Sequence, residues 1–203
     1  MSDSKDTSST PPKGSDSDSS GPGADLRVVV DRDRLSARVL EMARDITDCY
    51  GSSEITIVGV MTGAFVFLAD LMRNLSMPIR LDIVSVCSYP GESTTSRGPQ
   101  LTLPPRGDLK GKHVLIVDDI LDSGGTMTFL TDMFSAAGAK SLRTCVLLRK
   151  DLGRPVDRPD ADFVGFDIAD EFVVGYGLDY DDLYRGLPDL CVLELPAETE
   201  GDR

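Results

Sequence analysis

The sequence predicts an α/β fold, a twisted and mainly parallel sheet with helices on both of its faces. Two observations support this fold class. Strand-like apolar runs alternate with segments of helical spacing along most of the chain, as in successive βαβ units. The central run over residues 114–117 is Val-Leu-Ile-Val. It lacks the alternation of a strand that faces water on one side, so both of its faces should be buried.

Composition sets the number of domains and argues against some partners. The chain has 203 residues, of which 40% are hydrophobic, and this is enough for one well-buried domain. Its formal net charge of −13 argues against a nucleic-acid partner. No apolar window reaches the length of a membrane span, so no membrane partner is expected. Four scattered cysteines without a CxxC pair are typical of free thiols in a reducing cytoplasm, which is the expected location.

Residues 1–25 consist mainly of Ser, Asp, Pro, Gly and Thr. They lack the apolar surface that would offset their ordering entropy, so we expect a disordered tail there and one folded domain over residues 26–203. In that domain, one apolar helical stripe predicts a first helix, which ends at Gly51, a residue suited to the position after a helix. The stripe comprises Leu35, Val39, Leu40, Met42, Ala43 and Ile46.

The rest of the domain continues as alternating strands and helices. Its polar loops follow strands, and ligands of this fold class bind beyond the carboxyl ends of the strands. Strands are predicted at 54–60, 79–87, 142–148, 161–168 and 190–195, besides the central strand that begins at His113. Helices are predicted at 64–75 and from Met127 to Ala137.

The end of the central strand carries an unusual group of polar residues. Asp118 and Asp119 come where the strand should leave the core, and Asp122, two glycines and two hydroxyls follow before the next helix. The loop offers consecutive backbone N–H groups and the positive end of a helix dipole, which suit a phosphate. The carboxylate pair should bind something else, either a diol or a hydrated metal ion. A simple helix N-cap with turn glycines would explain the small residues but not the three carboxylates.

Other motifs with clustered aspartates fit this stretch less well. The Asp-Asp-x-x-Asp motif of isoprenoid synthases lies on a helix of an all-α fold, whereas here a strand precedes the acidic pair and glycines follow it. A phospho-acceptor receiver domain has an acidic pair at a strand end but does not need Ser-Gly-Gly-Thr beside it. A Walker A loop would require Gly-Lys-Ser/Thr, which this stretch does not contain.

Residues 114–126, Val-Leu-Ile-Val-Asp-Asp-Ile-Leu-Asp-Ser-Gly-Gly-Thr, resemble the phosphoribosyl-diphosphate (PRPP) signature of the type I phosphoribosyltransferases. The resemblance is closest to the hypoxanthine-guanine branch, and with further matches it covers about residues 32–195. It implies the fold of that family, with a small hood formed by the terminal segments. It also implies that Asp122 acts as general base and acid at N7 of a purine. Asp118 and Asp119 would bind the ribose 2- and 3-hydroxyls, and Ser123, Gly124, Gly125 and Thr126 would hold the 5-phosphate.

Two further loops resemble parts of the same family. Met61-Thr62-Gly63 is similar to the pyrophosphate loop, which is often Leu-Lys-Gly with a cis peptide before its middle residue. Thr62 stands in place of the usual lysine, which leaves backbone amides and a hydroxyl for pyrophosphate. An ordinary βα turn is the alternative. Ser88 and Tyr89 resemble the start of a flexible lid, although the long polar stretch after them is equally typical of a disordered linker.

The purine site is implied by residues near the ends of two later strands. Lys150 resembles the family's donor to the 6-oxo group, and because an ammonium only donates, it favours 6-oxopurines over adenine. Phe172 resembles the aromatic lid on the purine, and the main chain of Val173 would contact its Watson–Crick edge. The alternative for Lys150 is a solvated surface lysine, and the alternative for Phe172 and Val173 is an ordinary core strand.

Metal and pyrophosphate contacts are implied by the last polar segment. Asp179 would border the purine and coordinate Mg²⁺, for which Asp118 and Asp119 are further candidate ligands. Arg185 would pair with pyrophosphate oxygens through its fork of donors. A surface ion pair between Asp179 and Arg185 is the alternative.

The resemblance therefore implies a Mg²⁺-dependent enzyme of purine salvage, which converts hypoxanthine or guanine and PRPP into IMP or GMP and pyrophosphate. A homodimer or homotetramer is expected. The same fold acting on xanthine remains open, and so does a regulator that senses PRPP or a nucleotide. The charge of −13 and the lack of a recognisable nucleic-acid-binding module weigh against a regulator that binds nucleic acid.

Overall fold

A computed structural model of the protein describes residues 25–88, 99–153 and 159–194. Of the expected disordered tail, residues 1–24 lie outside the described residues, and Asp25 is the first residue of a strand. In chain order the elements are β1 (Asp25–Val30), α1 (Arg32–Tyr50), β2 (Ile55–Met61), α2 (Phe65–Asn74), β3 (Ile79–Ser88), β4 (Pro99–Leu103), β5 (His113–Leu121), α3 (Gly125–Ala136), β6 (Ser141–Asp151), β7 (Phe163–Ala169), β8 (Val173–Val174) and β9 (Leu190–Glu194).

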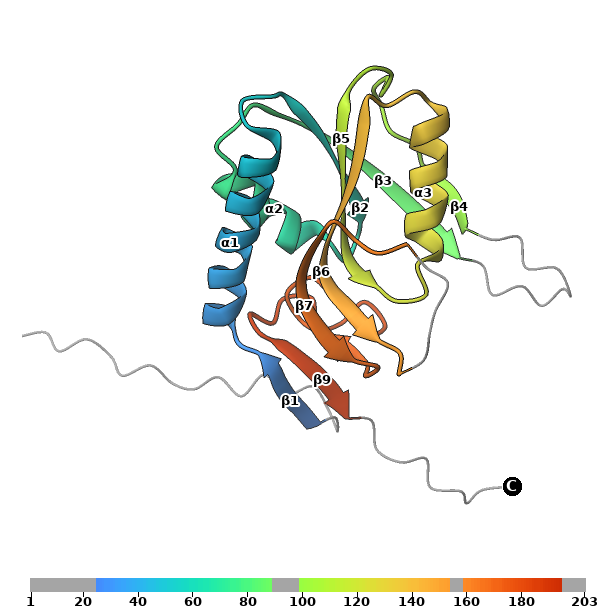
Figure 1. The fold of residues 1–203 in the computed structure, drawn as a ribbon. Coiled ribbons are helices and arrows are strands. Elements are labelled where there is room, and N and C mark those ends of the chain that lie inside the picture. The colour runs from blue at the N-terminus through green and yellow to red at the C-terminus, as the bar shows by residue number, and fades with distance from the viewer. Residues whose placement is uncertain (1–24, 89–98, 154–158, 195–203) are drawn as a thin grey trace, which may run out of the picture.

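The larger sheet has six strands in the order β4-β3-β2-β5-β6-β7. Its strands β3, β2, β5, β6 and β7 are parallel, and β4 pairs antiparallel at one edge. Helices α1 and α2 cover one face, and α3 covers the other (Figure 1). This arrangement confirms the predicted fold class.

The central strand β5 is apolar without alternation because both of its faces are covered. Leu115 and Val117 belong to the apolar cluster under α1 and α2. Val114 and Ile116 belong to the cluster under α3. All four side chains are fully buried. The polar residues of β5 therefore lie near its two ends, and its two carboxylates lie at the carboxyl end.

Helix α1 begins and ends as its sequence predicts. The Asp31 side chain accepts the backbone N–H of Arg34 at 2.9 Å and caps the N-terminus. At the other end Gly51 has a φ of 60° and donates its N–H to the carbonyl of Thr47. Five of the six residues assigned to the apolar stripe are buried. The exception is Leu40, which is 37% exposed, so its inclusion in the stripe was wrong.

The second sheet is a small hood made from both ends of the domain, as expected. Strands β1, β9 and β8 form an antiparallel sheet in that order. It lies beyond the carboxyl ends of β6 and β7 (Figure 1). The Arg27 guanidinium on β1 is paired with Glu171 at 2.5 Å and with Glu194 at 3.2 Å, which joins β1, β9 and the segment before β8. The hood therefore covers one side of the edge at which β5 ends.

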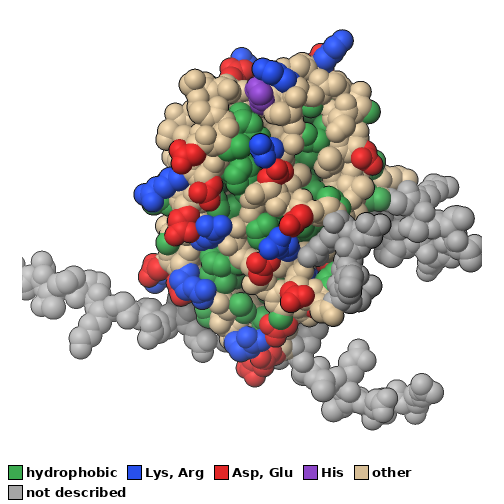
Figure 2. Space-filling view, viewed as in Figure 1, with side chains coloured by type: hydrophobic (Ala, Val, Ile, Leu, Met, Phe, Trp, Pro, Cys, Tyr) green, Lys and Arg blue, Asp and Glu red, His purple; other side chains and the backbone are tan. Residues whose placement is uncertain are grey.

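The surface carries both signs of charge. In the face shown in Figure 2, Lys and Arg side chains lie among Asp and Glu, with apolar side chains between them. No helix within the described ranges is long and apolar enough to cross a membrane. All four cysteines are free. Cys145 and Cys191 are buried and Cys87 is half-buried, but Cys49 on α1 is exposed.

Candidate active site

Two cavities meet at the carboxyl end of β5. The first has a volume of about 300 Å³ and lies between the loop after β2 and the loop before α3. The second has a volume of about 200 Å³ and lies between β5, the end of β6 and the hood. Asp119, Ile120 and Asp122 line both. The first cavity contains Met61, Thr62, Gly63, Asp118, Asp119, Asp122, Ser123, Gly124, Gly125 and Thr126 among its lining residues. The second contains Asp119, Asp122, Lys150, Phe172, Val173 and Asp179.

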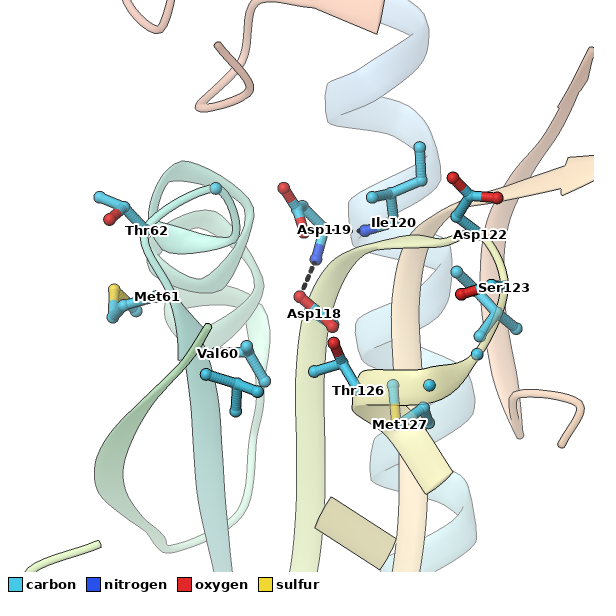
Figure 3. A pocket seen from close by; sticks show the side chains of 15 residues that line it. Val60, Met61, Thr62, Asp118, Asp119, Ile120, Asp122, Ser123, Thr126 and Met127 are labelled. Atoms are coloured by element: carbon cyan, nitrogen blue, oxygen red, sulfur yellow. Dashed lines mark hydrogen bonds between the residues drawn. The ribbon is translucent and has the colours of Figure 1, made fainter. Parts of the chain in front are cut away.

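The two adjacent carboxylates lie between the walls of the first cavity (Figure 3). Oδ1 of Asp118 accepts the N–H of Asp119 at 3.0 Å, and Oδ1 of Asp119 accepts the N–H of Ile120 at 2.9 Å. Burial raises the pKa of the Asp118 carboxyl well above its usual value, and the neighbouring Asp119 charge acts in the same direction. Ligand hydroxyls or a cation would stabilise this pair of charges.

The N-terminus of α3 opens onto the same cavity without a side-chain cap. Gly124 occupies the cap position with a φ of 82°, and no side chain accepts a hydrogen bond from the first turn. The backbone N–H groups at the start of a helix have no partner within it. Here they belong to residues that line the cavity, including Gly125 and Thr126. Gly124 is thus an N-cap with the backbone of a turn glycine, as the capping alternative expects. Because it has no side chain to accept a hydrogen bond, the N–H groups of the first turn remain available to an anion.

The loop after β2 forms the opposite wall. It contains a cis peptide bond between Met61 and Thr62, as the resemblance implies. A Cβ atom added to Gly63 would lie 1.8 Å from Oδ2 of Asp119, so only a glycine leaves room for that carboxylate. The loop and the acidic pair are therefore in direct contact, although 56 positions separate Gly63 from Asp119 in the sequence.

The second cavity contains an ammonium between two carboxylates. The Lys150 Nζ atom lies 2.9 Å from Oδ1 of Asp170 and 3.8 Å from Oδ2 of Asp122, and its side chain is only 14% exposed. Lys150 is thus not the solvated surface lysine of the alternative interpretation. Asp170 was not predicted as a partner of Lys150, although it lies only two residues before Phe172, which was predicted to belong to the purine site.

An aromatic pair stands at the rim of this cavity. Phe172 is 50% exposed, and its ring meets that of Tyr180 edge to face at 5.4 Å between centroids. Val173, the first residue of β8, is buried and lines the cavity. The exposed Phe172 is not part of a core strand, and its face is available to an apolar ring. Tyr180 is a second residue that sequence reasoning missed.

Asp179 and Arg185 form an ion pair with each other, as the alternative to metal and pyrophosphate contacts expects. Their side chains approach to 2.9 Å, and Arg185 also contacts Asp182 at 3.1 Å and the carbonyl oxygen of Gly177 at 3.0 Å. Asp179 lines the second cavity, whereas Arg185 lines neither. The expected contact between Arg185 and pyrophosphate stays a prediction.

The expected lid begins at the end of β3. Ser88 is the last residue of that strand, and Tyr89 and the residues after it, up to 98, lie outside the described part of the chain. Residues 99–103, which belong to the polar stretch after Tyr89, form the edge strand β4.

A divalent cation fits the carboxylates of this site when a substrate contributes ligands. No group of three or more His, Cys, Asp or Glu side chains in the described residues is arranged to hold a metal alone. Mg²⁺, however, is usually held by one or two carboxylates together with substrate phosphates and water. Asp119 and Asp179 line the same cavity, and Asp118 is adjacent.

Another cavity, of about 290 Å³, lies at the opposite edge of the sheet, near the amino ends of β2 and β3. Its arginines are paired with acids, Arg80 with Glu54 and Arg106 with Asp82. Asp82 is buried and accepts three backbone N–H groups from surrounding residues, so it serves the loop before β5 as a structural anchor.

Comparisons with known proteins identify the family of this chain. The family model of the phosphoribosyl transferase domain matches residues 30–181. Hypoxanthine phosphoribosyltransferase of Salmonella typhimurium is 41% identical over 165 residues, which cover 80% of this chain and 92% of the relative. Hypoxanthine-guanine phosphoribosyltransferase of Bacillus subtilis is 38% identical over 175 residues, which cover 86% of this chain and 96% of the relative.

A solved structure has the same fold. The crystal structure of a hypoxanthine-guanine phosphoribosyltransferase from Bacillus anthracis superimposes with a TM-score of 0.77 at 35% identity and covers 84% of this chain and 99% of its own. Together with the sequence matches, this similarity establishes that the chain belongs to the phosphoribosyltransferase family, in its hypoxanthine-guanine branch.

Proposed function

We propose that this protein is a Mg²⁺-dependent purine salvage enzyme that transfers the phosphoribosyl group of PRPP to hypoxanthine, and also to guanine, and releases pyrophosphate. The observation that carries the proposal is the junction of two cavities at Asp119 and Asp122. A sugar phosphate in the first cavity and a purine in the second would meet beside these carboxylates. Substitution at the anomeric carbon requires this juxtaposition of reactants.

The first cavity suits the ribose 5-phosphate. The uncapped N-terminus of α3 supports a phosphate at Ser123, Gly124, Gly125 and Thr126, because free N–H groups and the helix dipole both favour an anion. Asp118 and Asp119 accept hydrogen bonds from the ribose 2- and 3-hydroxyls. Their negative charge also stabilises the positive charge that develops on the ribose ring in the transition state.

The second cavity suits a 6-oxopurine. Its ring stacks on the exposed face of Phe172 and contacts the main chain of Val173. Lys150 donates to the 6-oxo group, and Asp122, which is 3.8 Å from the Lys150 ammonium, exchanges a proton with N7. Since Asp122 borders both cavities, it can act on the purine while N9 faces the sugar.

The leaving group belongs near the loop at Met61, Thr62 and Gly63, which offers backbone amides and a hydroxyl. When bound, Mg²⁺ neutralises charge on the diphosphate. Asp179 would hold the ion, and Asp118 and Asp119 are the other candidate ligands. Arg185, which is paired with Asp179, would contact pyrophosphate oxygens through its fork of donors. Ser88 and Tyr89 begin the lid that excludes water from the reacting centre.

A steady-state assay with PRPP, Mg²⁺ and one purine at a time tests this proposal. Hypoxanthine and guanine should give IMP, GMP and pyrophosphate, adenine should give no product, and EDTA should abolish turnover. Turnover with xanthine alone would show that xanthine, and not hypoxanthine or guanine, is the purine substrate. PRPP binding without turnover of any purine would contradict the proposed enzyme and favour a PRPP sensor.

The resemblance to the family supports a homodimer or homotetramer in the cytoplasm. The free thiols of Cys145 and Cys191, both buried, suit a reducing compartment. Light scattering after size exclusion should return the mass of two or four chains, and the mass of one chain would contradict the expected assembly.

A further inference from the structure

A short segment of the hood has an unusual backbone. Gly175, Tyr176 and Gly177 all have left-handed φ angles, of 93°, 49° and 104°. Glycine adopts such angles freely, but a tyrosine does so only where the surrounding structure imposes them. The segment is closed by hydrogen bonds from Tyr176 N–H to the Leu187 carbonyl at 2.8 Å and from Gly177 N–H to the Arg185 carbonyl at 3.0 Å.

The side chain of Tyr176 leaves the hood and contacts α2. It is 8% exposed, and its hydroxyl donates to Oδ2 of Asp70 at 2.6 Å. Burial raises the pKa of the Tyr176 phenol well above its usual value, and the Asp70 carboxylate acts in the same direction. The Tyr176 hydroxyl is therefore the donor of this hydrogen bond and the Asp70 carboxylate is its acceptor. Asp70 is also paired with Arg73 of the same helix.

The anchored segment lies against the loop after β2. A Cβ atom at Gly177 would lie 2.4 Å from the carbonyl oxygen of Gly63, so the two backbones are in direct contact. Gly63 in turn contacts the carboxylate of Asp119. On the other side of Gly177, Leu178 and Asp179 line the second cavity. One continuous set of contacts thus joins α2, the loop, the acidic pair and the base cavity.

We propose that Tyr176 and Asp70 are positioning residues whose hydrogen bond fixes the hood against the loop at Met61, Thr62 and Gly63, and so sets the relative position of the purine and pyrophosphate sites. This inference rests on the proposed function. Neither side chain lines the cavities. Without the bond, the segment at Gly177 and Asp179 lies in its binding-competent position for a smaller fraction of the time, and apparent affinity falls with that fraction.

Single substitutions test the proposal by separating KM from kcat. Tyr176→Phe removes only the hydroxyl and should raise KM for PRPP, and for pyrophosphate in the reverse reaction, by about ten-fold or more, since a hydrogen bond to a charged group contributes at least about that factor. The kcat should change less than KM. Asp70→Ala removes the same hydrogen bond, together with the ion pair to Arg73, and should raise KM at least as much as Tyr176→Phe. The double variant should have no higher KM than Asp70→Ala alone, because Tyr176→Phe then has no bond left to remove. Asp70→Asn retains an acceptor oxygen and should restore most of the affinity.

Tyr50→Phe is the matched control. Tyr50 is also buried, and its hydroxyl bonds the Val114 carbonyl at 3.5 Å, at the opposite end of the sheet. The Tyr50→Phe variant should have a lower melting temperature than the wild type and the same KM for PRPP and for pyrophosphate. If Tyr176→Phe and Asp70→Ala also leave both KM values unchanged, the positioning role is wrong. A wild-type protein that transfers phosphoribose to no purine would instead overturn the proposed function.

Discussion

The contact between Gly63 and Asp119 permits a sharp test of the site. In Gly63→Ala, the new Cβ would lie 1.8 Å from Oδ2 and 2.6 Å from Cγ of Asp119, against an ordinary contact of 3.4–4 Å. The carboxylate must therefore move by roughly 1.6 Å, and displacements of about 1 Å within an active site can cost about 10²-fold in rate. Because the clash is with the end of the Asp119 side chain and not with the backbone, the variant should still fold.

Steady-state kinetics and thermal unfolding together measure this effect. Gly63→Ala should lower kcat/KM for PRPP by about 10²-fold, while its unfolding free energy falls by no more than about 2 kcal/mol. Gly186→Ala is the control, because no atom lies within 4 Å of a Cβ at that hood position. It should match the wild type in both measurements. A Gly63→Ala enzyme with wild-type kcat/KM would refute the proposed role of the Asp119 carboxylate.

Three further substitutions test separate parts of the account. Asp122→Asn should retain PRPP binding by calorimetry but lose about 10²- to 10⁴-fold in kcat, as expected for a general base; unaltered kcat would remove that role. Lys150→Met should lower kcat/KM for hypoxanthine by about 10- to 100-fold, the contribution of a charged donor to a carbonyl, and an unchanged ratio would show that Lys150 does not contact the 6-oxo group. Three backbone N–H bonds lower the pKa of Asp82 although burial opposes them, so its stabilisation is present at neutral pH and is lost as the pH falls through the folded-state pKa. Urea unfolding should therefore show Asp82→Asn to be less stable at pH 7 by about 1–3 kcal/mol and closer to the wild type below about pH 4; a gap that does not narrow would contradict this.

The elements that could be predicted from the sequence are those whose pattern is local. Burial on both faces makes β5 an unbroken apolar run, and one-sided burial gives α1 its stripe. The strands that sequence reasoning missed depend on distant partners. β1 carries only three consecutive valines and is a strand because it pairs with β9, at the other end of the domain. β4 is a partly exposed edge strand that begins with a proline.

The same distinction applies to the site. Asp118, Asp119 and Asp122 are close in sequence, and a strand end brings them into one cavity. The partners Asp170 of Lys150 and Asp70 of Tyr176 were not predicted, because each lies on a different segment from the residue that it contacts. Tyr180 meets Phe172 only because the chain turns back between them, at Gly175 and Leu178. Such pairings follow from the packing of the hood on the sheet, which no local pattern encodes.

The structure of the protein with PRPP, Mg²⁺ and an unreactive purine analogue tests the central claim most directly. We expect the 5-phosphate within about 3 Å of the backbone N–H groups at the start of α3, with the ribose hydroxyls on Asp118 and Asp119 and the analogue between Lys150 and Phe172. PRPP bound elsewhere, with the first cavity empty at saturating concentration, would contradict it.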